Sequence, residues 1–286
     1  MAALTGRGDR VRVLTRRAAP ADAAQTPAVE YFQWDGIRPA LAALRDIDVV
    51  VHLAGEPIFG GVPTRGSMAR MVSSRVDSTH AIAARILELE PPERPKRFVC
   101  ASAVGIYGDR AEERLDEAST PGFGFLADLC RNWEAATNDA QTAGLAVTRM
   151  RLGVILSRLG GALPMMRLPF EWNVGGCLGN GRQWVPWVHL DDVIGALTLA
   201  IDGGIEGTVN VVAPNPVTNR ELTRQLAERL GKRVFLPVPG FALRAVLSEI
   251  ASELLGSKFV APDALERARY RFVHSELATA LAAELP

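Results

Sequence analysis

Short apolar runs alternate along this chain with longer segments that have helical periodicity. Five runs are rich in β-branched residues and predict strands that are buried on both faces, as in a parallel sheet. They span residues 11–15, 48–55, 97–105, 145–156 and 207–213. Residues 73–90, 124–144 and 191–204 carry apolar side chains at helical spacing between these runs. Strands separated by helices predict βαβ units, and therefore an α/β fold with a doubly wound parallel sheet.

The pattern changes after residue 213. A helix is predicted at 220–231, with Asn219 as its N-cap. A proline-rich link at 236–240 then leads into a tail that is helical and contains no strand longer than a few residues. We therefore expect an α/β domain at 1–213 and a small helical lobe at 214–286. This lobe should pack on the carboxyl edge of the sheet, where substrates bind in such folds.

The first residues have the pattern of a helix end. Residues 2–8 predict a last helical turn that stops at Gly8, and the strand at 11–15 follows at once. A helix that ends eight residues into a chain should have begun earlier. The sequence therefore starts where the middle of a fold is expected.

The composition is that of an ordinary globular protein. Among 286 residues, Lys+Arg and Asp+Glu balance at 32 each, so no global field attracts nucleic acid or an anionic membrane. Cys100, Cys130 and Cys177 have no CxxC spacing, and we expect neither a disulfide framework nor a metal site. With no apolar run near the roughly 18 residues that span a bilayer, we expect a cytoplasmic protein that acts on a small molecule.

Thr15, Arg16 and Arg17 stand at the end of the first predicted strand. In a dinucleotide-binding fold, an acidic residue at such a strand end binds the ribose 2′-hydroxyl, whereas arginine accommodates a 2′-phosphate. Two arginines without an acid favour NADP over NAD. A solvated basic turn would give the same pattern.

Two further strand ends combine small and polar residues. Residues 53–55 would let the backbone approach a flat ligand, or would simply form a tight turn that needs a glycine. The next strand ends near Ser102 and Tyr107, whose hydroxyls would point into the crevice at the carboxyl edge, unless the turn is only structural. His52 lies in mid-strand, where we expect a core histidine.

Seven motifs occur in the order and spacing of one protein family. They are HLAGEP, SSRVDSTHAI, SAVGIYG, CRNWEAA, RLGVIL, GNGRQWVPWVHLDDV and LLGSKFVAPDALERA. Through them the chain resembles, from about residue 2 to its C-terminus, the epimerase-like branch of the atypical short-chain dehydrogenases/reductases. Members of this branch carry a short C-terminal domain of unknown function. The resemblance implies a Rossmann core that binds NADP(H).

The resemblance also bears on the first residues. Family members begin with a strand and a glycine-rich turn, whose backbone N–H groups hold the pyrophosphate of the cofactor. A helix then leads into a segment similar to residues 4–17. By this comparison the chain lacks the first strand, the turn and most of the first helix, which would impair cofactor binding. Either the start codon is misplaced or the protein is genuinely shorter.

Family positions for the cofactor transfer onto six residues. The resemblance implies a 2′-phosphate near Thr15 and Arg16, adenosine against Leu53 and Ala54, a cofactor contact for Arg75, and the nicotinamide half beside Ile155. For Arg75 the alternative is an exposed charge on a helix.

The sequence departs from the family where the chemistry is expected. Sugar-nucleotide epimerases use a Tyr-x-x-x-Lys pair for proton transfer. This chain has Leu126 and Cys130 at those positions, and neither can do that acid–base work. Ala103 occupies the usual serine register, and Ser102, one residue earlier, is the remaining serine candidate.

Proton transfer must then come from other groups. Tyr107 and His189 are the candidates, although His189 could instead form a structural hydrogen bond at the start of the following helix. Arg182, Gln183 and Trp187, in a glycine-containing loop, are candidate substrate contacts, and the tryptophan could equally be core packing.

Two functions fit these observations. The first is an NADP-dependent oxidoreductase or epimerase-like enzyme with an unknown substrate. The second is a catalytically silent, nucleotide-binding regulator, because some relatives are named cell-division inhibitors. The vacant Tyr-x-x-x-Lys positions favour the regulator, whereas the polar and aromatic residues of the crevice favour the enzyme.

Overall fold

The computed structural model describes residues 1–20, 27–58 and 63–285. Its central sheet has four parallel strands in the order β11–β6–β4–β3. These strands are β3 (Val49–His52), β4 (Arg97–Ala103), β6 (Ala146–Leu152) and β11 (Gly207–Val211). Four of the five predicted strands therefore lie in one sheet.

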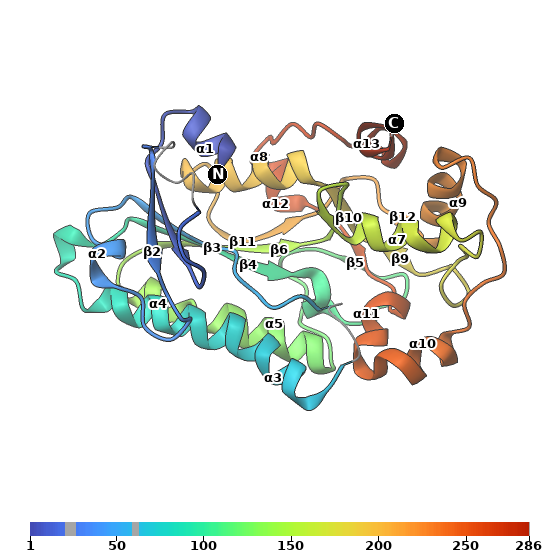
Figure 1. The fold of residues 1–286 in the computed structure, drawn as a ribbon, viewed down its shortest axis with the longest axis horizontal. Helices are drawn as coiled ribbons and strands as arrows, with labels where there is room; N and C mark the ends of the chain where they lie inside the picture. The colour runs from blue at the N-terminus through green and yellow to red at the C-terminus, as the bar shows by residue number, and fades with distance from the viewer. Residues whose placement is uncertain (21–26, 59–62, 286) are drawn as a thin grey trace.

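Helices cover both faces of this sheet (Figure 1). One face carries α4 (Ser78–Leu87) and α5 (Phe125–Ala135), and the other carries α8 (Leu190–Ile201) and α12 (Asp263–Arg267). Phe98 and Val99, neighbours on β4, are both fully buried and belong to two different hydrophobic clusters. Successive side chains of a strand point to opposite faces, so β4 is buried on both. This arrangement confirms the predicted doubly wound, Rossmann-like α/β sheet.

A second, two-stranded parallel sheet stands beside the central one (Figure 1). It consists of β1 (Val11–Thr15), whose bounds match the prediction, and β2 (Val29–Gln33). Sequence analysis missed β2, because Glu30 and Gln33 interrupt its apolar pattern. The short α1 (Ala2–Gly6) precedes β1, and α2 (Leu41–Leu44) follows β2. Within the described residues, no strand pairing joins β2 or β1 to β3.

The long strand predicted at 145–156 is two strands. After β6 ends at Leu152, β7 (Val154–Ser157) leaves the central sheet and pairs with β10 (Trp187–His189) and β8 (Gly160–Gly161). A Cβ atom on Gly153 would lie 2.4 Å from the Pro186 carbonyl oxygen, so only glycine permits this close crossing. The remaining elements of this region are α7 (Ala162–Glu171) and β9 (Trp184–Val185).

Two predicted helices differ from the observed ones. The helix predicted at 73–90 is preceded by α3 (Arg65–Val72) and joined to it by a π-helical turn at Ser73–Asp77. Thr64 and Ser67 form a capping box that starts α3, a signal the sequence analysis missed. The segment predicted at 124–144 is interrupted, with α6 (Asn138–Thr142) following α5.

The region after residue 213 is mostly helical. Its elements are β12 (Val217–Thr218), α9 (Asn219–Arg229), α10 (Gly240–Leu247), α11 (Ala251–Leu255), β13 (Phe259–Val260), α12 and α13 (Leu277–Glu284). The N-cap of α9 is Thr218 rather than Asn219: the Thr218 hydroxyl accepts from the backbone N–H of Glu221, whereas the Asn219 side chain accepts from the backbone N–H of Leu178.

This region is joined to the α/β domain through backbone pairing. β13 pairs in parallel with β5 (Arg114–Leu115), and β12 pairs with β9. In Figure 1, α10 and α11 lie at the carboxyl edge of the central sheet, as the sequence predicted for this lobe. None of the helices that the structure describes is both long and apolar enough to cross a bilayer.

Candidate functional site

A cavity of about 220 Å³ opens at the carboxyl ends of β3, β4 and β6. Its wall is mostly apolar, and among the described lining residues the ionisable groups are Arg75, Cys130 and Glu253. Ligands of doubly wound folds bind outside the carboxyl ends of the strands. A largely apolar cavity with a few polar groups at this edge is therefore the candidate site.

Arg75 is buried in the cavity wall and is not an exposed helix charge. It lies in the π-helical turn, and its guanidinium carbon is 5.3 Å from the ring centroid of Trp133. Burial lowers the pKa of Arg75. A Cβ atom on Gly55 would lie only 2.8 Å from that guanidinium carbon, so the glycine at the end of β3 makes room for the cation.

A buried ion pair forms the wall behind Ser102. The Arg151 guanidinium contacts both carboxylate oxygens of Glu134, with Nε–Oε1 at 2.8 Å and Nη2–Oε2 at 2.9 Å. The Ser102 hydroxyl donates to Oε1 of the same carboxylate at 2.7 Å. This contact fixes the hydroxyl of Ser102 at the end of β4, inside the cavity lining.

Tyr107 lies on the inner side of this network and is fully buried. Its hydroxyl accepts from Nη1 of Arg151 at 2.8 Å, and it is within donating distance of Asn210 Oδ1 at 2.7 Å and the Asp116 carbonyl oxygen at 2.8 Å. Burial raises the pKa of Tyr107. Among the described residues, Tyr107 does not line the cavity. Its predicted catalytic role is untested and stays a prediction.

Helix α5 presents Leu126 and Cys130 to the cavity, at the positions where sugar-nucleotide epimerases have tyrosine and lysine. Burial raises the pKa of the Cys130 thiol to about 12, so this side chain is neutral at physiological pH. Neither residue can exchange a proton with a substrate under ordinary conditions.

Glu253 is a functional candidate that sequence reasoning missed. It comes from α11, and its Oε2 lies 3.3 Å from the ammonium nitrogen of the buried Lys258. A Cβ atom on Gly105, at the end of β4, would lie 3.3 Å from the same oxygen. Glu253 and Lys258 are the two charged residues of segment 251–260, which is otherwise uncharged, and this was the available signal. Of the described lining residues, Glu253 supplies the carboxylate.

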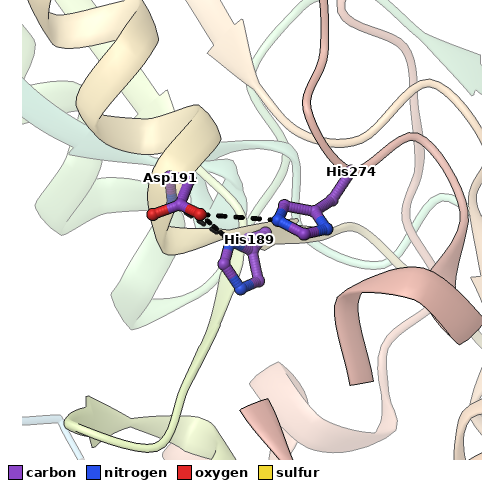
Figure 2. Close-up of side chains that lie close together, drawn as sticks. All are labelled: His189, Asp191 and His274. Carbon is purple, nitrogen blue, oxygen red and sulfur yellow. Dashed lines mark hydrogen bonds and ion pairs between the residues drawn. The ribbon is translucent and has the colours of Figure 1, made fainter. Parts of the chain in front are cut away.

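His189 belongs to a different cluster, with Asp191 and His274 (Figure 2). It is buried, and its Nδ1 accepts from the backbone N–H of Asp191 at 3.1 Å, which caps α8. This geometry matches the structural alternative that the sequence left open, and the predicted catalytic role is untested.

The three candidate substrate residues do not meet in the cavity. Trp187 is fully buried and donates from Nε1 to the Asn215 carbonyl oxygen. Gln183 is buried, and its side chain donates to two backbone carbonyl oxygens. Arg182 lines a separate hollow of about 670 Å³ together with Arg220 and Arg224. Their substrate contacts remain predictions.

The candidate cofactor residues follow the carboxyl ends of several strands. Thr15 ends β1, and Arg16 after it is exposed. Leu53 lines the cavity and is 52% exposed, and Ala54 beside it is exposed as well. Ile155 lies on β7 opposite Val188. No contact of the structure tests these assignments.

Comparison with known proteins identifies the family. The NAD dependent epimerase/dehydratase family matches residues 1–213, and a domain of unknown function (DUF1731) matches residues 238–284. The chain belongs to the NAD dependent epimerase/dehydratase family. The resemblance inferred from the seven sequence motifs is thereby confirmed.

Two relatives illustrate the extent of the similarity. An epimerase family protein of Mycobacterium leprae is 39% identical over 243 residues, which cover 84% of this chain and 77% of the relative. The epimerase family protein YfhF of Bacillus subtilis is 34% identical over 282 residues, covering 97% of this chain and 90% of the relative. Both domains of the chain therefore fall within the similarity to YfhF.

Solved structures confirm the fold. The crystal structure of the human epimerase family protein SDR39U1 with NADPH matches with a TM-score of 0.86 and 31% identity, covering 99% of this chain and 93% of that one. UDP-glucuronic acid 4-epimerase from Bacillus cereus, in complex with NAD, matches with a TM-score of 0.77 but only 15% identity. At 15% identity, the similarity to the Bacillus cereus epimerase supports the fold and nothing about function.

Proposed function

We propose that this protein binds NADP(H) and catalyses an oxidoreduction or isomerisation of a small molecule in the cavity at the carboxyl edge of the sheet. The observation that carries the proposal is the presence of a cation, Arg75, and a carboxylate, Glu253, in the wall of one largely apolar cavity. The human relative crystallised with NADPH supports the choice of cofactor.

The residues present fit a dinucleotide. Gly55 makes room for the Arg75 guanidinium in the cavity wall, and Gly105 does the same for the Glu253 carboxylate. Arg16 is an exposed cation at the end of β1, where a 2′-phosphate is recognised in this fold. When bound, NADP(H) supplies or accepts a hydride. Arg16 would hold its 2′-phosphate, and Arg75 would contact the part that enters the cavity.

Glu253 is the group best placed to move a proton. Its carboxylate reaches the cavity, and the buried ammonium of Lys258 holds it in position. Tyr107 is enclosed by three polar partners, and His189 lies in the separate cluster at the start of α8. A general base must come within hydrogen-bond distance of its substrate, and Glu253 meets this requirement more readily than either.

A second candidate function rests on Leu126 and Cys130. They occupy the positions of the usual acid–base pair. Leucine has no ionisable group, and burial raises the pKa of Cys130 to about 12, so neither residue ionises near neutral pH. This observation favours a nucleotide-binding regulator that has no catalytic activity. Turnover separates the two functions, because an oxidoreductase consumes NADPH in the presence of a substrate, an isomerase converts its substrate without net consumption of the cofactor, and the regulator does neither.

The test measures both NADPH oxidation and isomerised product across a panel of small carbonyl compounds and quinones. General acid–base groups contribute about 10²–10⁴-fold to rate, so Glu253→Gln should lower turnover at least 100-fold without changing NADPH affinity. Glu249→Gln is the matched control, because Glu249 is an exposed carboxylate just before the same helix. Undiminished turnover in Glu253→Gln would refute this role. Tight NADPH binding without turnover would favour the regulator.

A further inference from the structure

Three potential metal ligands converge at the junction between the two regions of the chain. His189 ends β10, Asp191 lies in the first turn of α8, and His274 lies in the segment before α13. One ligand atom from each lies within 4.8 Å of the others. In Figure 2 the two imidazole rings stand side by side, and both are joined to Asp191.

The distances suit a small divalent ion. Oδ2 of Asp191 is 3.5 Å from Nδ1 of His189 and 3.4 Å from Nε2 of His274. Zinc binds imidazole nitrogen and carboxylate oxygen at about 2.0–2.2 Å in a tetrahedral arrangement. Neighbouring ligand atoms are then about 3.3–3.5 Å apart, which matches the two separations from Asp191, and all three ligand atoms lie within 4.8 Å of one another.

Glu284 provides an independent indication. Its Oε1 lies 3.0 Å from Nε2 of His189, a close contact that lacks hydrogen-bond alignment in this structure, and both side chains are buried. Metal-binding histidines typically donate their second ring N–H to a carboxylate, which fixes the tautomer. A proton on Nε2 leaves the lone pair of Nδ1 directed at the cluster.

Two features of the structure must adjust when an ion binds. Nδ1 of His189 accepts from the backbone N–H of Asp191, and this N–H lies at an exposed helix start where water can replace the contact. The ring centroids of His189 and His274 are 3.8 Å apart and would have to separate. Asp192 holds the backbone N–H of His274, so the separation must come from rotation of the His274 side chain.

The local charge favours a cation. Asp191 and Glu284 carry negative charge beside the two rings and offset the positive end of the α8 dipole. Asp192 is engaged elsewhere: its carboxylate accepts from the Tyr270 hydroxyl and from the backbone N–H groups of Val273 and His274. Asp192 therefore holds the C-terminal segment against α8 without competing for the ion.

We propose that His189, Asp191 and His274 bind one divalent transition metal, and zinc is the probe because it is bound by two imidazoles and a carboxylate in known sites. The Asp191 side chain is 59% exposed, so water can enter and occupy the fourth position. The ion joins the start of α8 to the C-terminal region and stabilises their contact. It uses none of the cavity residues and is independent of the proposed function.

Zinc titration of the metal-free full chain tests the proposal. Calorimetry and elemental analysis should give one tightly bound zinc per chain. His274→Ala and Asp191→Asn should each weaken binding at least tenfold, and Glu284→Gln should do so by about tenfold or more, as for other carboxylates behind a ligand. His80→Ala is the matched control: His80 also faces a carboxylate, Asp139 at 3.3 Å, but has no second histidine.

Two further readouts keep the test decisive. Zinc should raise the melting temperature of the wild-type chain but not that of Asp191→Asn. The Asp191 side chain is 59% exposed, so this substitution should leave the fold intact. Cys177→Ser should bind zinc as the wild type does, because the thiol is outside the site. Absence of stoichiometric binding, or equal affinity in the wild type, His274→Ala and Asp191→Asn, would overturn the proposal.

Discussion

Arg151 and Glu134 form a two-point ion pair directly behind the cavity that contains the site residues. Only 7% and 12% of the two side chains are exposed. Burial alone would lower the pKa of Arg151, but the hydrogen bonds and charge of Glu134 raise it. The pair links β6 to α5, and it orients the Ser102 hydroxyl on one side and the Tyr107 hydroxyl on the other.

Replacing Arg151 with methionine should destabilise the fold strongly. The substitution leaves the Glu134 carboxylate buried without its cation, and breaking a buried pair in this way costs about 3–5 kcal/mol. Urea unfolding measures the loss. Arg131→Met is the control, because Arg131 pairs with Asp128 at the surface and such pairs contribute about 0–1 kcal/mol. Similar losses in the free energy of unfolding in both variants would show that the Arg151–Glu134 pair stabilises the fold no more than a surface ion pair does.

Gly55→Ala should weaken NADPH binding by about tenfold or more. The new methyl group would meet the Arg75 guanidinium at 2.8 Å and displace it from the cavity wall, and a hydrogen bond to a charged group contributes about 1.5–3 kcal/mol. Fluorescence titration with NADPH measures the change. Gly66→Ala is the control, because the nearest contacts of its Cβ atom are 3.8 and 3.9 Å away. If Gly55→Ala binds NADPH as tightly as the control does, Arg75 does not contact the cofactor.

His52 should make stability depend on pH between about 4 and 6.5. Burial, together with the nearby Arg75 charge, lowers its pKa from 6.5 to about 4 in the folded protein. The unfolded chain therefore binds a proton first as the pH falls, and the free energy of unfolding decreases through this window by up to about 3 kcal/mol. Above pH 6.5 His52 is neutral in both the folded and the unfolded chain, so its protonation no longer lowers the free energy of unfolding.

Unfolding of the wild type and His52→Asn at several pH values isolates this contribution. The difference between their free energies of unfolding should shrink as the pH is lowered from 6.5 to 4. A difference that stays constant over this range would mean that His52 keeps an ordinary pKa.

Local patterns predicted the strands of the sheet because these strands are buried on both faces. Val11–Thr15 was also predicted with its observed bounds, but it lies in the separate two-stranded sheet and is only partly buried, so the expectation that it is buried on both faces was wrong. The strand Val29–Gln33 was missed because its polar residues interrupt the pattern. The break at Gly153 could not be predicted, because it depends on the Pro186 carbonyl, which approaches from a segment distant in sequence.

The sequence could predict only those site residues that lie at the carboxyl ends of predicted strands. Residues at the ends of β3 and β4, such as Leu53 and Ser102, were predicted to face the crevice because parallel strands share one carboxyl edge, and both line the cavity. Glu253 and His274 reach their partners through tertiary packing of the C-terminal region. Periodicity within one segment contains no information about such contacts.

The most direct test of the account is the relative affinity of this chain for NADPH and NADH. NADPH should bind at least tenfold more tightly, and Arg16→Ala should remove about tenfold of the NADPH affinity, because a charge-assisted contact is worth about 1.5–3 kcal/mol. Arg10→Ala, at another exposed arginine before β1, should change neither affinity. Equal affinities for NADPH and NADH in the unsubstituted protein would contradict the account.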